Sequence, residues 1–270
     1  MMTIEEMQDR TKSLLVSTIG FPATLIHGDT LVLDRWQWLR RRLGPGAGKR
    51  LLDVGCGTGA FTIGAARLGY RALGLSWDER NQRVARHRAA LCHAHTAEFE
   101  ICDVRQLHTR DDLVSRFDIT ICLETIEHIL DDRKVVRDIS RTLRPGGRLL
   151  LTTPNVDYRA ITKSDNGPFS TYEDGWHVRR GYSAEHLAGI ADEAGLSVDS
   201  ISWCSGYLSQ KVTGLLRVLS GKNHYLAWGL TFPLRGIPPL LDGPVTRVLN
   251  WPHYSICLEA TKKAGASDRA

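Results

Sequence analysis

The segment that constrains this chain most is the apolar run at residues 51–54, which glycines at positions 55, 57 and 59 follow at once. The run, Leu-Leu-Asp-Val, predicts a short buried strand. The glycines predict a turn too tight for side chains, in which a ligand can approach the backbone closely. Good helix formers follow from Ala60 onward. The segment therefore predicts a strand, a glycine turn and a helix, the arrangement of a cofactor loop at the carboxyl end of a parallel strand.

Two kinds of nucleotide-like cofactor use such a turn. Gly55, Gly57 and Ala60 satisfy the loose dinucleotide pattern G-x-G-x-x-G/A. A dinucleotide site usually carries an acid on the ribose about 20 residues further on, but the corresponding strand end here offers Ser76. Asp53, just before the glycines, is placed to meet an ammonium group instead. These residues favour a cofactor that carries an amino acid over a dinucleotide.

The rest of the chain alternates between strand and helix patterns. Repeated strand–helix units predict an α/β fold with a parallel sheet covered on both faces, and right-handed crossovers make it doubly wound. We expect a mostly parallel, seven-stranded sheet. Its strands are predicted at 50–54, 71–75, 98–102, 117–123, 147–153, 197–203 and 254–261, and the helices that follow them at 58–68, 78–92, 131–143 and 183–194.

Three parts are predicted along the chain. Residues 1–48 carry helices at 4–19 and 30–43, which we expect to cap the cofactor site. The core comprises 49–203 and 254–263. Between the last two strands, 204–253 forms a helical insertion that is too short and too interrupted by proline to span a bilayer. We interpret it as a lid that forms a wall of the acceptor pocket or a dimer contact; a flap for a lipid-linked substrate or a membrane surface is the alternative.

Charge and cysteine content limit the partners. The formal net charge is +5, but the arginines are spread along the chain, which indicates solvated helix faces rather than a nucleic-acid groove. The six cysteines show no C-x-x-C spacing, which argues against a disulfide framework or structural zinc. The first ten residues carry acids and no apolar core, so they do not form a signal peptide. We therefore expect a cytoplasmic protein.

The glycine segment resembles the first motif of class I S-adenosylmethionine-dependent methyltransferases. The resemblance extends over residues 49–195 and implies S-adenosylmethionine as cofactor. It implies that Asp103 pairs with the adenine amino group while the backbone of Val104 meets the ring. Ser76 departs from the family's Asp or Glu, so the ribose is held more weakly or by Asp78. The implied cofactor-binding residues are Asp53, Gly55, Gly57, Gly59, Ser76, Trp77, Asp103, Val104 and Leu123.

A second segment, Glu124-Thr-Ile-Glu127-His128, follows strand 117–123 at the same edge of the sheet. Carboxylates and an imidazole so close together are costly unless they are paired or bind a metal. A later loop brings His177 to this edge. The E-x-x-E-H run with a later histidine resembles the ubiquinone-biosynthesis O-methyltransferases and the small-RNA 2′-O-methyltransferases.

From that resemblance, Glu124, Glu127, His128 and His177 are the predicted metal quartet. Such a set suits Mg²⁺, Mn²⁺ or Zn²⁺. The metal-free alternative makes His128 or His177 a general base, with Glu127 as the third catalytic candidate. In a purely structural alternative the two glutamates cap the next helix and His177 is a loop residue.

The expected activity is O-methyl transfer from S-adenosylmethionine to a hydroxyl group. A sugar hydroxyl, in a glycan or a glycosylated metabolite, is the first choice of acceptor, because the polar loop 157–183, rich in Asp, Asn, Thr, Tyr and Trp, suits carbohydrate. A quinone or polyphenol precursor is the near alternative. An RNA 2′-O-methyltransferase would need a basic groove, which the sequence lacks. A non-catalytic cofactor-binding subunit would have no need of the glutamates and histidines.

Overall fold

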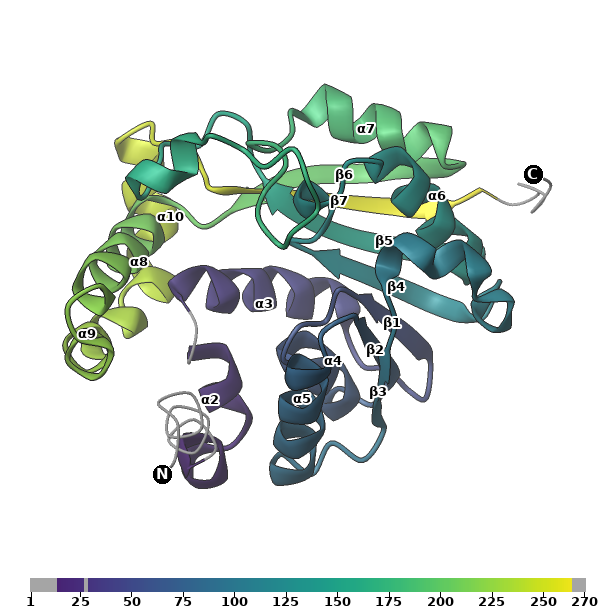
Figure 1. Ribbon diagram of the computed structural model, residues 1–270, viewed down its shortest axis with the longest axis horizontal. Helices are drawn as coiled ribbons and strands as arrows, with labels where there is room; N and C mark the ends of the chain where they lie inside the picture. Colours follow the sequence, from purple (N-terminus) through teal and green to yellow (C-terminus); the bar gives the residue numbers. More distant parts are fainter. Residues whose placement is uncertain (1–13, 27–28, 264–270) are drawn as a thin grey trace.

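The computed structural model describes residues 14–26 and 29–263. Within them, seven strands form one sheet in the order β3-β2-β1-β4-β5-β7-β6 (Figure 1). All pairings are parallel except those of β7, which runs antiparallel to both neighbours. The strands are β1 (Arg50–Val54), β2 (Arg71–Ser76), β3 (Ala97–Ile101), β4 (Phe117–Leu123), β5 (Leu143–Pro154), β6 (Leu196–Cys204) and β7 (Ser255–Lys262).

The predicted doubly wound, mostly parallel α/β sheet is confirmed, and one strand differs in extent. The sequence predicted a strand that begins at residue 147, whereas β5 already pairs at Leu143, opposite Phe117. The register then shifts before Ile119 pairs with Arg148. Residues 143–147 therefore form an irregular extension of β5, in which Gly146 has a φ of +75°.

Apolar side chains on successive strand residues point to opposite faces, and each face has its own core. Leu51 and Ile121 pack with α3 and α4 on one face, whereas Leu52 and Cys122 pack with α6 and α7 on the other. Figure 1 shows these helices on the two sides of the sheet. The helices are α2 (Phe21–Ile26), α3 (Thr30–Leu43), α4 (Ala60–Arg67), α5 (Glu79–Leu91), α6 (Asp132–Thr142) and α7 (Ala184–Glu193).

Strand β1 pairs with β2 on one side and β4 on the other, so the strand order reverses there. In open parallel sheets, ligands bind in the crevice at such a point, beyond the carboxyl ends of the strands. The glycine turn follows β1, and two 3₁₀ turns, η1 (Val104–Thr109) and η3 (Ile126–His128), follow β3 and β4. The topology therefore brings the predicted site residues to one edge.

The insertion between β6 and β7 is helical: it contains α8 (Tyr207–Ser220), α9 (His224–Thr231) and α10 (Pro238–Val248). At the other end of the chain, residues 14–19 are helical, and the rest of the helix predicted at 4–19 lies outside the described residues. Helix α3 packs against both the sheet region and α8 (Figure 1). Across the described residues, no helix combines the length and apolarity needed to cross a bilayer. The cytoplasmic location stays a prediction, as do the domain boundaries.

Candidate active site

A cavity of about 400 Å³ lies at the carboxyl edge of β1, β2, β3 and β4. Four loops and one more distant segment, 173–175, enclose it. Its lining residues are Gly55, Gly57, Ser76, Trp77, Asn81, Asp103, Val104, Arg105, Glu124, Thr125, His128, Ile129, Glu173, Asp174 and Gly175. Many of the residues that the sequence predicted for cofactor binding and catalysis therefore share one cavity wall.

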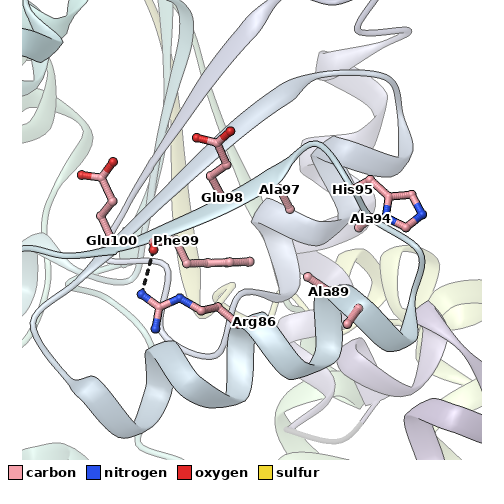
Figure 2. A pocket seen from close by; sticks show the side chains of 9 residues that line it. Arg86, Ala89, Ala94, His95, Ala97, Glu98, Phe99 and Glu100 are labelled. Atoms are coloured by element: carbon pink, nitrogen blue, oxygen red, sulfur yellow. Dashed lines mark hydrogen bonds between the residues drawn. The ribbon is translucent and has the colours of Figure 1, made fainter.

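A second cavity, of about 430 Å³, lies between α5 and β3 (Figure 2). Several alanines and Phe99 line it, and Arg86 donates a hydrogen bond of 2.9 Å to the Phe99 carbonyl. None of the predicted site residues lies on its wall. The predicted cofactor-binding and catalytic residues therefore lie around the cavity at the carboxyl edge and not around this one.

The three glycines after β1 have different structural roles. A Cβ on Gly55 would lie 2.4 Å from Oγ1 of Thr125, so the loop after β4 requires this glycine. A Cβ on Gly59 would lie 2.7 Å from Phe99, so that glycine allows α4 to pack. A Cβ on Gly57 would meet nothing within 4 Å, and Gly57 lines the cavity. Gly57 is thus the glycine whose missing side chain leaves room for a ligand.

Asp53 lies below the glycine turn rather than on the cavity wall. Its side chain accepts a hydrogen bond of 2.6 Å from Thr62, and the residue is 1% exposed. Burial raises the pKa of Asp53 to about 7, against the opposing effect of the Thr62 hydrogen bond. The predicted contact between Asp53 and the ammonium group, and that of the buried Leu123 with the cofactor, stay predictions.

The end of β2 carries the ribose candidates. Ser76 is buried at the cavity, and its Oγ accepts a bond of 3.4 Å from the amide of Asp78. Asp78 caps α5, with Oδ1 accepting bonds from two amides of the first turn. Trp77 is 65% exposed, so it lines the cavity and does not fill the core. Asn81, which the sequence did not single out, also lines the cavity.

Changing Ser76 to aspartate should tighten cofactor binding by about tenfold, because a carboxylate forms stronger hydrogen bonds to a ribose diol than a hydroxyl does. Isothermal calorimetry with S-adenosylhomocysteine measures the change, and Ser76→Ala is the matched control that should weaken binding. Weaker binding by the Ser76→Asp variant than by Ser76→Ala would show that the ribose is held by other groups.

Beyond β3, Asp103 is paired with a cation. The Arg105 guanidinium donates to both carboxylate oxygens, at 2.6–2.9 Å, and holds the pKa of Asp103 below its usual range. Arg105 also pairs with Glu173 at 2.9 Å, and Glu173 accepts a bond from the amide of Leu130. Adenine recognition by Asp103 and the backbone of Val104 stays a prediction. The geometry adds Arg105 and Glu173, which tie the adenine side of the cavity to the later loop.

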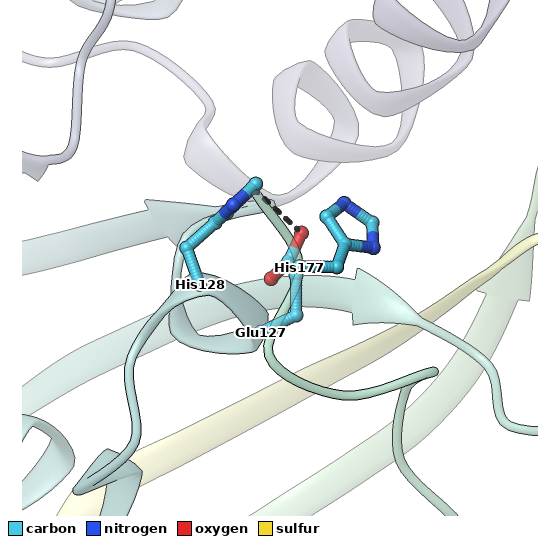
Figure 3. Close-up of side chains that lie close together, drawn as sticks. All are labelled: Glu127, His128 and His177. Atoms are coloured by element: carbon cyan, nitrogen blue, oxygen red, sulfur yellow. Dashed lines mark ion pairs between the residues drawn. The ribbon is translucent and has the colours of Figure 1, made fainter. Parts of the chain in front are cut away.

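Three members of the predicted quartet come together. Ligand atoms of Glu127, His128 and His177 all lie within 4.8 Å of one another (Figure 3). The rings of the two histidines meet edge to face, with centroids 4.6 Å apart. Glu127 is fully buried; Oε2 accepts a bond from Thr153, whereas Oε1 has no hydrogen-bond partner among the described residues and lies 3.9 Å from Nε2 of His128.

Glu124 does not join that group. Its φ is +50°, and its carboxylate forms an ion pair of 2.9 Å with Arg35 of α3. The hydroxyls of Thr152 and Ser255 donate to the same carboxylate, each at 3.0 Å. Arg35 therefore lies beside the carboxylate that the sequence assigned to a metal, and the four-ligand arrangement stays a prediction. Arg35 lies on a predicted helix with no motif around it, so no sequence signal marked it.

Burial sets the protonation of the group. It raises the pKa of Glu127 well above its usual range, and the negative charge of Glu124 adds to the effect. It lowers the pKa of His128. Burial and the neighbouring His128 lower the pKa of His177 to about 4. Both imidazoles are therefore neutral near pH 7 and can accept a proton or a metal ion.

Backbone contacts hold the His177 loop against the loop after β4. The amide of Val178 donates to the Glu127 carbonyl at 3.0 Å. Arg179 donates to the carbonyls of Ile129 and Leu130 and forms an ion pair with Asp132. Loop 170–182 and η3 thus form one assembly, which explains how residues so far apart in sequence share a site.

The fold and cavity define the Rossmann-like class to which class I methyltransferases belong. Phosphoethanolamine N-methyltransferase 2 of Haemonchus contortus, solved with S-adenosyl-L-methionine, superimposes with a TM-score of 0.62 at 20% identity, over 91% of this chain and 57% of that one. The [4+2]-cyclase SpnF superimposes at 0.55 and 20% identity, over 95% and 81%. These likenesses show the fold, which serves more than one chemistry.

Sequence relatives narrow the class. A family profile described as a methyltransferase domain matches residues 32–201, which excludes the insertion. The ubiquinone biosynthesis O-methyltransferase of Pseudomonas aeruginosa (strain UCBPP-PA14) is 31% identical over 179 residues, 62% of this chain and 72% of that protein. The protein of the same name from Acinetobacter baumannii (strain AYE) is 31% identical over 45% and 50%. The chain belongs to the S-adenosylmethionine-dependent methyltransferases.

Proposed function

We propose that this methyltransferase transfers the methyl group to a hydroxyl of a small molecule bound against His128 and His177. The observation that carries the proposal is the convergence of Glu127, His128 and His177 beside the cofactor cavity, with His128 on its wall. The O-methyltransferase names of the sequence relatives favour the same acceptor atom. Alignment of donor and acceptor can supply about 7–11 kcal/mol of the barrier.

The acceptor hydroxyl has to lose its proton as it attacks the methyl group. His128 and His177 are neutral near pH 7, so either imidazole can take that proton, and general-base catalysis of this kind contributes about 10²–10⁴-fold. His128 is placed better, because it lines the cavity. Oε1 of Glu127 lies 3.9 Å from Nε2 of His128, so a positive charge on the ring would favour ionisation of this buried carboxyl, and the carboxylate would in turn stabilise the imidazolium.

The same three residues fit a divalent metal ion. They supply one carboxylate and two neutral imidazoles, a donor set that suits several divalent ions. Oε1 of Glu127 and Nδ1 of His128 are buried without a hydrogen bond to any described residue, which leaves donor atoms unused. A carboxylate as buried as Glu127 is costly to ionise unless a cation lies beside it. Such an ion, when bound, lowers the pKa of a coordinated hydroxyl.

Removal of divalent ions distinguishes the metal-assisted mechanism from the metal-free general-base mechanism. If the ion assists the reaction, EDTA should suppress turnover by about 100-fold or more, and Mg²⁺ or Mn²⁺ should restore it. Binding of S-adenosylhomocysteine, measured in parallel by calorimetry, should be unchanged, since none of the three residues is among the predicted cofactor contacts. Full turnover in EDTA would exclude metal assistance and support only the general-base mechanism.

A phenolic hydroxyl is the favoured acceptor, because the relatives are named for ubiquinone biosynthesis. The sugar hydroxyl stays the second candidate. Tyr172 and Trp176, on the loop that carries His177, are 77% and 73% exposed and offer rings that stack on either kind of acceptor. Turnover of catechols compared with glycosides and with ribose-containing oligonucleotides, using radiolabelled S-adenosylmethionine, tests the acceptor class. Product from none of the three hydroxyl classes would contradict O-methyl transfer.

A further inference from the structure

The insertion leaves large apolar side chains in solvent. Leu226 and Leu230, one turn apart on α9, are 58% and 55% exposed. Leu240 and Val248 on α10 are 78% and 84% exposed. Only the inner faces of these helices are packed against the rest of the described chain. Soluble chains rarely keep so much apolar surface in water unless it meets a partner.

Helix α8 presents a mixed stripe. Exposed residues recur along one side of the helix at a spacing of three or four. They are Lys211, Leu215, Val218 and, just beyond the helix, Lys222, so two apolar side chains lie between two lysines. Leu215 and Val218 are 42% and 64% exposed. A helix face that combines apolar side chains with lysines is typical of a helix that lies in the interface of a membrane.

In the insertion, the negative charge is buried and the exposed charges are positive. Asp242 is the only carboxylate between residues 204 and 253. It is 9% exposed, and it accepts bonds of 2.7 Å from the amides of Gly206 and Leu208. The exposed charges are positive: Lys211, Lys222 and Arg247. An acid-free outer surface with exposed cations attracts anionic lipid headgroups.

We propose that α8, α9 and α10 dock the protein on an anionic membrane surface, with their exposed apolar side chains in the interface and Lys211, Lys222 and Arg247 against the headgroups. The three helices lie together on the flank of the molecule, with α3 between them and the strands (Figure 1). The sorting of charge favours a lipid surface over a second copy, because two such surfaces would bring like charges together.

Flotation of the full chain with vesicles tests the proposal. Binding should be strong to phosphatidylcholine vesicles that contain phosphatidylglycerol, weak to pure phosphatidylcholine, and reduced by salt. The variant Leu240→Asp/Val248→Asp should lower the bound fraction by about tenfold or more, since charged groups do not enter the interface. Lys222→Glu/Arg247→Glu should do so only for anionic vesicles. These positions are exposed, so cofactor binding should be unchanged.

The matched control is Ile101→Asp, at the end of β3 on the opposite edge of the sheet, where the side chain is 52% exposed. Its vesicle binding should equal that of the unmodified protein. Absence of the unmodified protein from anionic vesicles would overturn the proposal. So would a dimer, found by light scattering, that Leu240→Asp/Val248→Asp converts to monomer while vesicle binding stays the same.

Discussion

Replacement of Gly57 by valine is expected to abolish binding of S-adenosylmethionine. A Cβ added at this position meets no protein atom within 4 Å, and Gly57 lines the cavity, so the valine would occupy space that the cofactor needs. The affinity should fall by about 100-fold or more, which corresponds to a loss of about 2.8 kcal/mol of binding free energy. Calorimetry with S-adenosylhomocysteine measures it, and turnover at saturating acceptor should fall in parallel.

The control for this variant has to carry the same backbone strain. Gly57 has a φ of +50°, and Gly146 has a φ of +75°, where an added Cβ would likewise meet no atom within 4 Å. A β-branched residue is strained at both positions, at a cost of about 1–3 kcal/mol each. Gly146→Val should therefore lower the melting temperature to a similar extent and leave cofactor affinity intact. Equal loss of affinity in both variants would mean that global strain, and not the cavity, explains the Gly57 result.

Changing His128 to asparagine should lower kcat by about 10²–10⁴-fold, since it removes the imidazole on the cavity wall. The cofactor affinity should stay within about threefold, because the predicted contacts to adenine and ribose lie on other loops. Stopped-flow or radiochemical turnover with saturating S-adenosylmethionine measures the rate.

The double variant His128→Asn/His177→Asn makes this prediction more specific. The rings of His128 and His177 are in contact, so we expect the two residues to act as one unit. The kcat of the double variant should then be only slightly lower than that of the slower single variant. His186→Asn, an exposed histidine on α7, is the control and should keep its turnover. A His128 variant within about tenfold of the unmodified rate would remove this residue from the mechanism.

The sheet could be predicted because its strands carry strong local signals. Most residues of the runs at 50–54 and 117–123 are apolar, as is typical of strands buried on both faces, and β1 and β4 have the predicted bounds. The start of β5 was missed for the opposite reason. Arg144, Pro145 and two glycines carry the composition of a turn, and only the neighbouring Phe117 shows that the chain is already paired.

For the candidate site, the sequence by itself determined which reactive side chains lie near the carboxyl edge of the sheet. Glu127 and His128 are neighbours, and a strand that ends just before them puts them at the cofactor edge in any parallel sheet. The later His177 reaches the same edge, because it follows another strand of that sheet. The topology suffices for Glu127 and His128, whereas His177 also depends on the contacts of Val178 and Arg179 that hold its loop.

The tertiary structure alone decided which partner each carboxylate has. Glu124 and Glu127 look equivalent in the sequence, yet Glu124 turns to Arg35 of α3 while Glu127 faces the histidines. Arg105 likewise pairs with Glu173 of a later loop, 68 residues away in the chain. A carboxylate binds whichever cation or donor the packed fold brings within about 3 Å, and that choice depends on elements far away in the chain. Spacing along the sequence contains no record of those distances.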